Sequence, residues 1–275
     1  MLTPRLSVII PASNEAEYIG DCLAALLASG PINAECIVVA NGCRDATAEV
    51  ARGYTAQAAA AGWALVILDL PQGGKPNALN AGDKIAKSPL RVYLDADVIV
   101  SPNLMVELIA ALGGTAALYA TGTAQIPRAK SAVTRSYARF WQRLPFATSS
   151  APGYGLFATN AAGRARWGDF PAIISDDTFA RLQFEPHERL QVPATYQWPM
   201  IEGFAALTRV RRRQDAGVTE VDRLFPGLLA REAKAPLGKA RLLALALRDP
   251  VGFATYAAVS LAVRLKSGQD WTRGR

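Results

Sequence analysis

Histidine and cysteine are scarce in this sequence. Its 275 residues include one histidine, His187, and three cysteines that form no C-x-x-C pair, at Cys22, Cys36 and Cys43. An odd number of cysteines cannot close into a complete set of disulfides, so we expect a reducing compartment. A zinc site built from histidine and cysteine is not expected either, and any metal would be a hard cation held by carboxylates.

Long apolar runs of the kind that enter membranes are also missing. Residues 1–5 lead directly into a strand-like run, without the apolar segment of a secretory signal. The uncharged stretch 108–127 contains glycines, threonines and a glutamine, which make it too polar for a membrane-spanning helix. We expect a cytoplasmic protein, with peripheral attachment to the inner face of the membrane kept open.

Positive charge is concentrated near the C-terminus. The net charge is +7, and residues 205–275 carry 14 lysines and arginines against six acidic residues, whereas the preceding part carries 16 and 17. Nucleic-acid binding would spread the excess more widely, so we expect no nucleic acid as a partner. A basic tail fits an anionic membrane surface or a pyrophosphate.

The remaining composition predicts a folded α/β protein. Hydrophobic residues make up 51% of the chain and charged residues 19%, which excludes disorder. Short apolar runs alternate with segments of helical periodicity, at residues 6–10, 36–39, 65–70 and 90–94. This alternation predicts a mostly parallel, Rossmann-like sheet flanked by helices. Residues 237–265 add a tail of two apolar helices, broken at Asp249-Pro250.

Polar loops follow each of the four predicted strands. They comprise residues 11–15, 41–45, 72–77 and 95–97. Because ligands of parallel sheets bind beyond the carboxyl ends of the strands, we expect the chemistry of this protein in these loops. Asp95 and Asp97 stand out, since alternate residues of an extended chain point the same way and two carboxylates can hold Mg²⁺ or Mn²⁺. The alternative is a strand-end turn with solvated aspartates.

These four loops also carry a family resemblance. The segments concerned read SVIIPASNE at 7–15, IVVANGCRDAT at 37–47, GKPNALNAG at 74–82 and DADV at 95–98. Together they resemble the motifs of family 2 glycosyltransferases, which are inverting enzymes of the GT-A fold. The resemblance is close from residue 5 to about residue 100 and loose over the next hundred.

The resemblance implies a nucleotide-sugar site with a divalent metal. It places Pro11, Ser13 and Glu15 near the base and ribose of the donor, and Lys75 near its phosphates. Asn80 belongs to the matching third motif, Asp97 would bind Mg²⁺ or Mn²⁺ directly, and Asp95 would contact the ribose or the metal.

Each of these residues also has a simpler interpretation. Asn41 stands where the family has an aspartate that contacts the base, which leaves the nucleotide preference open. Asn41-Gly42 can be an ordinary turn, and Glu15 a first-turn residue that favours the helix dipole. The segment around Lys75 can be a loop with proline in the first helical turn, and Asn80 a solvated helix residue.

The general base that an inverting transfer requires is assigned by the same resemblance to Asp177, with Asp176 in place of the family's glutamate. The alternative is that these aspartates cap the helix that begins there. Gly153 and Gly155, with Trp141 and Trp167, are candidates for an acceptor pocket, although core packing is the preferred role of the tryptophans. The arginines between residues 209 and 213 form a basic cluster near pyrophosphate or acceptor, or a solvated face.

We therefore expect a catalytic domain at 1–225, with a nucleotide-binding half at 1–100 and an acceptor half at 101–225, and a helical extension at 226–275. The extension can lie on a membrane, pack on the domain or form a dimer interface. The expected activity is metal-dependent inverting transfer of a sugar from a nucleoside diphosphate sugar, with UDP favoured, to a hydroxyl of a glycan or lipid-linked glycan, as in polysaccharide biosynthesis. The alternatives are a sugar nucleotidyltransferase, whose glycine-rich basic first loop is missing here, and a non-catalytic nucleotide-sugar-binding protein.

Overall fold

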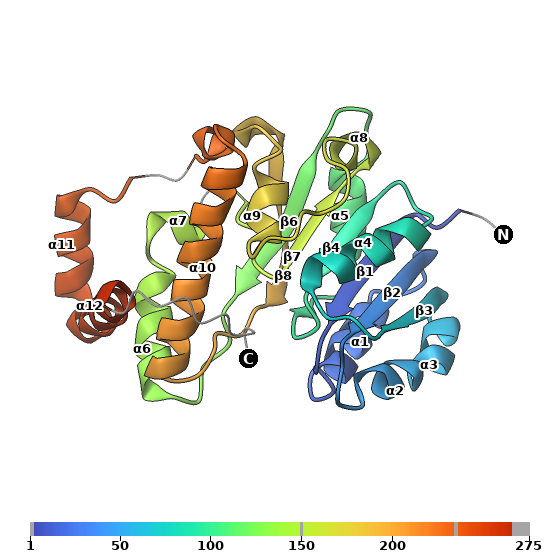
Figure 1. The fold of residues 1–275 in the computed structure, drawn as a ribbon, viewed down its shortest axis with the longest axis horizontal. Coiled ribbons are helices and arrows are strands. Elements are labelled where there is room, and N and C mark those ends of the chain that lie inside the picture. Colours follow the sequence, from blue (N-terminus) through green and yellow to red (C-terminus); the bar gives the residue numbers. More distant parts are fainter. Residues whose placement is uncertain (1–2, 149–150, 234–235, 266–275) are drawn as a thin grey trace.

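A computed structural model describes residues 3–148, 151–233 and 236–265. Within these residues eight strands form one sheet in the order β3-β2-β1-β4-β7-β6-β8-β5 (Figure 1). The strands are β1 (Leu6–Ala12), β2 (Ala34–Asn41), β3 (Trp63–Leu70), β4 (Arg91–Leu94), β5 (Ile99–Val100), β6 (Tyr119–Gln125), β7 (Leu156–Thr159) and β8 (Arg189–Gln197).

Helices cover both faces of this sheet and extend beyond it on the C-terminal side (Figure 1). They are α1 (Ile19–Leu27), α2 (Thr47–Arg52), α3 (Thr55–Ala60), α4 (Lys75–Ile85), α5 (Leu104–Ala111), α6 (Ala132–Trp141), α7 (Pro145–Thr148), α8 (Ala161–Arg164), α9 (Asp176–Arg181), α10 (Phe204–Leu224), α11 (Lys239–Arg248) and α12 (Pro250–Leu265), with 3-10 turns at Pro186–Glu188 and Leu228–Arg231.

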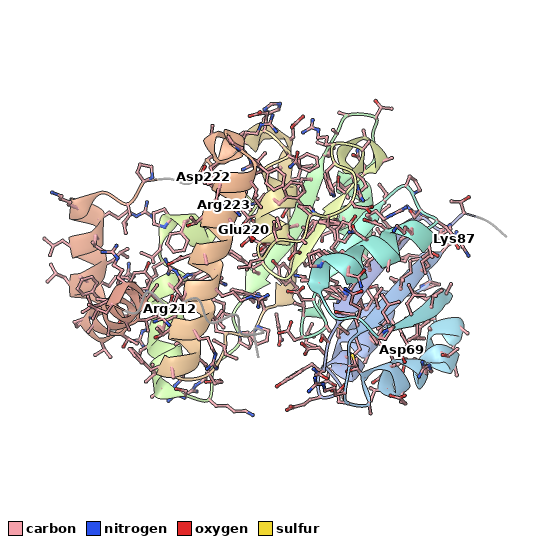
Figure 2. The ribbon with its side chains drawn as sticks, in the orientation of Figure 1. Asp69, Lys87, Arg212, Glu220, Asp222 and Arg223 are labelled. Atoms are coloured by element: carbon pink, nitrogen blue, oxygen red, sulfur yellow. The ribbon has the colours of Figure 1, made fainter. Side chains whose placement is uncertain are left out.

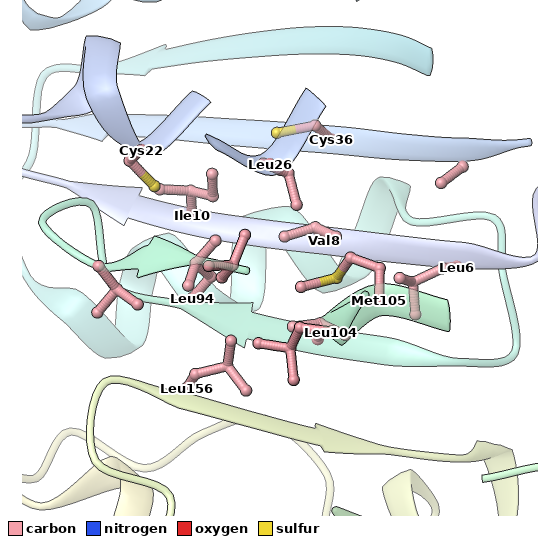
Figure 3. Packing of buried hydrophobic residues seen from close by; sticks show 14 of the residues in the cluster. Leu6, Val8, Ile10, Cys22, Leu26, Cys36, Leu94, Leu104, Met105 and Leu156 are labelled. Carbon is pink, nitrogen blue, oxygen red and sulfur yellow. The ribbon is translucent and has the colours of Figure 1, made fainter. Parts of the chain in front are cut away.

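Two hydrophobic cores lie on the two sides of the central strands. Val8 and Ile10 of β1 pack with Cys22 and Leu26 of α1, as Figure 3 shows. Ile9, between them in sequence, belongs to the opposite core with residues of α4 and α9. Because successive strand residues point to opposite faces, an uninterrupted apolar run such as 8–10 is buried on both sides.

The first four strands confirm the predicted parallel arrangement, within a sheet that is mixed overall. β1 pairs in parallel with β2 and β4, and β2 with β3. The second half is mixed: β7 is antiparallel to β4 and β6, β8 is parallel to β6, and β5 is antiparallel to β8. The helix predicted from about Asp45 begins at Thr47 and is divided at Gly53 into α2 and α3.

The predicted break between the two C-terminal helices is confirmed. Asp249 separates α11 from α12, and its carboxylate accepts a hydrogen bond from the backbone N–H of Gly252 at 3.0 Å. The same carboxylate binds Arg139 of α6 in two contacts of 2.7 and 2.8 Å, and Arg143 at 3.2 Å. The contacts with Arg139 lower the pKa of Asp249 to about 2. This cluster ties the helix pair to the rest of the protein.

Asn41 joins three segments at the carboxyl edge of the sheet. Its side-chain Nδ2 donates to the carbonyls of Ala12 at 2.9 Å and Val39 at 3.3 Å. Its Oδ1 accepts from the N–H of Gly74 at 2.9 Å, just before α4. The next residue, Gly42, has φ +59°, and a Cβ there would lie 2.8 Å from the backbone nitrogen of Gly73. The strand ends and the loop before α4 are therefore held in close contact.

Substitution Asn41→Asp should destabilise the protein by about 1 to 3 kcal/mol, because a buried carboxylate would face two carbonyl oxygens without a proton to donate. Urea unfolding measures the change. Asn103→Asp, the same substitution at an exposed position, is the matched control and should leave the free energy of unfolding nearly unchanged. Equal stability of the Asn41→Asp protein would show that the donated hydrogen bonds contribute nothing.

Substitution Asp249→Asn should cost about 1 to 2 kcal/mol at neutral pH, since the arginines are partly exposed and the pair is partly screened. Because the folded-state pKa of Asp249 is depressed from 3.8 to about 2, its contribution is complete above the ordinary value and is lost as the pH falls toward 2. Urea unfolding of both proteins across this range should show the difference shrinking in acid. A difference that does not change with pH would contradict this origin.

Candidate active site

The loops after β1, β2 and β4 and the loop before α4 line one cleft of about 600 Å³. Seven of the residues predicted from the sequence lie on it, namely Pro11, Ser13, Glu15, Asn41, Lys75, Asp95 and Asp97. They meet because parallel strands β1, β2 and β4 end at the same edge of the sheet.

The first two loops are tied to each other by hydrogen bonds. Asn14, at φ +60°, reverses the chain after β1, and its Oδ1 accepts from the N–H of Arg44 at 2.8 Å. The N–H of Glu15 donates to the hydroxyl of Thr47 at 2.9 Å. Desolvation would raise the pKa of Asp45, but hydrogen bonds from the hydroxyl of Thr47 and from the N–H groups of Ala16, at 3.1 Å, and Thr47 lower it. The polar side of the cleft is therefore preformed.

Asp95 and Asp97 lie on a tight turn and not on an extended strand. β4 ends at Leu94, and the N–H of Val98 donates back to the carbonyl of Asp95 at 3.1 Å. The argument that alternate strand residues point the same way is therefore wrong for this pair. Both aspartates nevertheless line the cleft, because the turn presents them together at its edge.

Lys75 connects this turn to a second acidic segment. Its ammonium lies 2.8 Å from Asp95 Oδ1 and 3.3 Å from Asp176 Oδ2. Burial disfavours the charge of Lys75, but Asp176 and Asp95 outweigh that effect and raise the pKa of the lysine. Burial raises the pKa of Asp176 to about 6, against the attraction of Lys75. Lys75 is thus a fixed cation between two carboxylates.

Asp177 lies behind this ion pair. It lines a small second cavity of about 20 Å³, which shares Pro11, Lys75 and Asp95 with the main cleft. α9 begins at Asp176, so both aspartates occupy its first turn, where the helix dipole favours negative charge. The N-cap residue is Ser175, and Asp177 accepts from the N–H of Thr178 at 2.7 Å.

Asn80 is not among the residues that line the cleft. Its side chain donates to the carbonyl of Phe170 at 3.0 Å and accepts from the N–H of the same residue at 2.7 Å. Both halves of the amide are therefore used to hold the loop before α9 against α4. The alternative of a solvated helix residue is wrong, since Asn80 is half-buried.

The opposite wall of the cleft is apolar, and Trp141 is the one residue of it that the sequence identified as a candidate. It comprises Tyr137, Trp141, Trp198, Pro199, Met200, Ile201, Leu207 and Val210. Tyr154 stacks on Trp198 at a ring distance of 5.0 Å and also contacts Trp141. The apolar run 198–201, directly after β8, was the available signal. Trp167 instead packs in the core against Phe170 and Phe184.

The arginines between 209 and 213 lie on α10 and point in different directions. Arg211 and Arg213 line the cleft. Arg212 donates to the carbonyl of Ala262 on α12 at 2.9 Å, on the side of α10 that faces the C-terminal helices (Figure 2). Arg209 is exposed. Because successive helix residues point in different directions, the four arginines do not act as one cluster: two line the cleft, one contacts α12 and one is in solvent.

Sequence comparison agrees with the resemblance in the loops. The model of the Glycosyl transferase family 2 matches residues 7–168, which is more than half of the chain. An uncharacterized glycosyltransferase of Rickettsia prowazekii (strain Madrid E) is 34% identical over 101 residues, which are 37% of this chain. The match spans only 30% of the length of that relative.

Similar folds occur in solved glycosyltransferase structures. A mannosyltransferase of Pyrobaculum calidifontis in complex with GDP-Man and Mn²⁺ matches with a TM-score of 0.61 and 20% identity, over 98% of this chain and 77% of the other. TarS of S. aureus in complex with UDP-GlcNAc matches with a TM-score of 0.56 and 13% identity, over 94% of this chain and 81% of the other. Glucosyl-3-phosphoglycerate synthase of Mycobacterium tuberculosis matches with a TM-score of 0.52 and 20% identity, over 85% of this chain and 81% of the other.

These likenesses confirm the expected GT-A fold, with its mixed sheet flanked by helices and a helical C-terminal region. The family match extends from β1 through β7, and so includes the three strand-end loops and the aspartate turn that line the cleft. The chain therefore belongs to glycosyl transferase family 2.

Proposed function

We propose that this protein is a glycosyltransferase and moves a sugar, with inversion, from a nucleoside diphosphate sugar to a hydroxyl of a glycan or lipid-linked glycan. The observation that carries the proposal is the cleft itself, in which the aspartate turn and Lys75 face an aromatic wall. Solved structures of similar fold hold GDP-Man or UDP-GlcNAc, which supports this donor class. UDP remains the favoured nucleotide.

The donor would lie along the polar side of the cleft. Pro11, Ser13 and Glu15 line it at the end of β1, where the base and ribose would bind. Asn41 uses its amide to hold the strand ends, so its proposed contribution is to position the loops around the base. Lys75 supplies positive charge for the diphosphate.

Asp95 and Asp97 are the residues that would hold Mg²⁺ or Mn²⁺. No cluster of three or more acidic, histidine or cysteine side chains suited to a metal occurs in the described part of the chain. Two carboxylates on an open cleft fit an ion that takes its remaining ligands from substrate phosphates and water. Such an ion, when bound, would neutralise the charge that develops on the leaving diphosphate.

Asp177 is proposed as the base that removes the proton of the acceptor hydroxyl. Asp177 lines the small cavity, and Pro11, Lys75 and Asp95 lie between this cavity and the cleft. An acceptor hydroxyl would therefore reach Asp177 past these three residues. The aromatic side chains of Trp141 and Trp198 offer faces on which a sugar ring could stack. When Asp177 takes the proton it becomes neutral, while Lys75 and Asp176 beside it would stay paired with each other.

The proposed division of the chain has a nucleotide-binding half at 1–100, an acceptor half at 101–225 and an extension at 226–275. β7 of the second half pairs with β4 of the first, so the two halves share one sheet. Family membership disfavours both the nucleotidyltransferase and the purely binding alternative.

Substitution Asp177→Asn should lower the rate of transfer by about 10²- to 10⁴-fold, because the base is removed, while leaving nucleotide binding intact. Substitution Asp97→Asn should lower the rate at least about 100-fold and also weaken the Mn²⁺-supported binding of UDP. Release of UDP from UDP-sugars measures turnover, and titration calorimetry with and without Mn²⁺ measures binding.

Asp222→Asn, an exposed acidic residue on α10, is the control and should behave like the unchanged chain (Figure 2). GDP- and dTDP-sugars should be assayed alongside UDP-sugars to identify the nucleotide that the donor carries. Full activity in Asp177→Asn would remove the assignment of the base, and metal-independent binding of every nucleotide would remove the role of Asp97.

A further inference from the structure

The C-terminal helices expose an unusual amount of apolar surface. Large hydrophobic side chains that are exposed in the described chain include five between residues 239 and 265. These are Leu243, Leu247, Val251, Leu261 and Leu265, with exposed fractions from 57% to 76%. Isolated exposed leucines are ordinary on protein surfaces, but a contiguous patch marks an interaction site.

These residues form continuous stripes. On α12 the exposed apolar residues are Val251, Ala254, Ala258, Leu261 and Leu265, at intervals of three and four that place them on one face. On α11 they are Ala240, Leu243, Ala244 and Leu247. We call these nine residues together the α11–α12 face.

The α11–α12 face is not the face that packs on the protein. Val259 of α12 is fully buried and joins Tyr137 of α6 and Leu207 of α10 in a third hydrophobic cluster. A helix at a protein surface ordinarily carries polar and charged residues on its outer side, whereas α12 is apolar on both sides. The exposed apolar stripe of α12 is therefore a candidate surface for contact with an apolar partner.

The charges around the α11–α12 face are of one sign. Lys239, Arg241, Arg248 and Arg264 are all exposed. The only acidic residue between positions 239 and 265 is Asp249, which is buried and paired with Arg139 of α6 and with Arg143 just after it. The exposed surface of the two helices thus combines apolar stripes with uncompensated positive charge.

We propose that the α11–α12 face docks on the surface of an anionic lipid bilayer. Its leucines and valine would enter the boundary between headgroups and acyl chains, and its basic residues would contact lipid phosphates. A symmetric dimer through the same face would bring like charges together, which disfavours a second copy as the occupant. None of the helices in the described segments combines the length and the apolar character needed to cross a bilayer.

Side-chain contacts hold α12 and its junction with α11 to the rest of the protein. Asp249 fixes the junction of the two helices to Arg139 and Arg143, and Arg212 of α10 holds the far end of α12 through Ala262. Docking on a bilayer needs neither the cleft nor a substrate, so it is independent of the proposed transfer reaction.

Flotation of the full-length chain with vesicles tests the proposal. Vesicles made of equal parts phosphatidylcholine and phosphatidylglycerol should carry the protein upward, and vesicles of phosphatidylcholine alone should not. Binding should weaken strongly in about 1 M salt, where the Debye length falls to about 3 Å. Equal binding to both vesicle types, or to neither, would overturn the proposal.

Matched double variants identify the face. Leu247→Gln/Leu265→Gln should lower the partition coefficient at least about tenfold, since two large apolar side chains no longer enter the lipid. Arg241→Gln/Arg264→Gln should lower it about 10- to 30-fold, because each basic residue near an anionic surface contributes about fivefold. Val106→Gln/Leu224→Gln and Arg5→Gln/Lys87→Gln, at exposed positions elsewhere, are the controls and should float like the unchanged chain.

Thermal unfolding verifies that each variant is folded, and light scattering measures its mass. Unchanged flotation of both face variants would reject the α11–α12 face as the docking surface. A dimer that dissociates in Leu247→Gln/Leu265→Gln would assign the face to a second copy instead, and would equally overturn the proposal.

Discussion

The charge of Lys75 holds together the segments that build the cleft. Its ammonium joins Asp95, in the turn after β4, to Asp176, at the start of α9, and Lys75 is itself the first residue of α4. Without this cation, two carboxylates from different elements would face each other across a small cavity, and their like charges would be unfavourable together. Lys75 also lines the cleft, so the proposed function would bring the diphosphate of the donor to the same side chain.

The sequence was sufficient to locate this site because its polar side is built from local motifs. Each predicted loop directly follows an apolar strand, and strands buried on both faces are the clearest signal in the chain. The same reasoning put Asp95 and Asp97 at the cleft, which they line, but gave the wrong backbone, since one intervening residue is compatible with either a strand or a turn. Only the hydrogen bond from Val98 to Asp95 distinguishes the two.

The features that were missed depend on contacts between distant residues. β7 joins β4 across more than sixty residues, and β6 carries Gly122 because a Cβ there would lie 2.7 Å from Leu104. Neither fact has a signature in local periodicity. Asn80 illustrates the same limit, since its partner Phe170 is ninety positions away and its motif alone indicates a ligand contact. The apolar wall at 198–201 likewise becomes a wall only when α6 and α10 pack beside it.

The cleft and the α11–α12 face share one structural support. α6 and α10 present Tyr137, Trp141 and Leu207 to the cleft, and α12 packs on the same two helices through Val259 and Tyr256 (Figure 1). The tyrosine rings of Tyr137 and Tyr256 stack at 5.6 Å, so the inner side of the wall continues directly into the C-terminal helices. A bilayer that held α12 would therefore hold the apolar wall of the cleft in a fixed orientation to the lipid surface. If both proposals hold, an acceptor anchored in that surface would reach the wall without diffusing through solution.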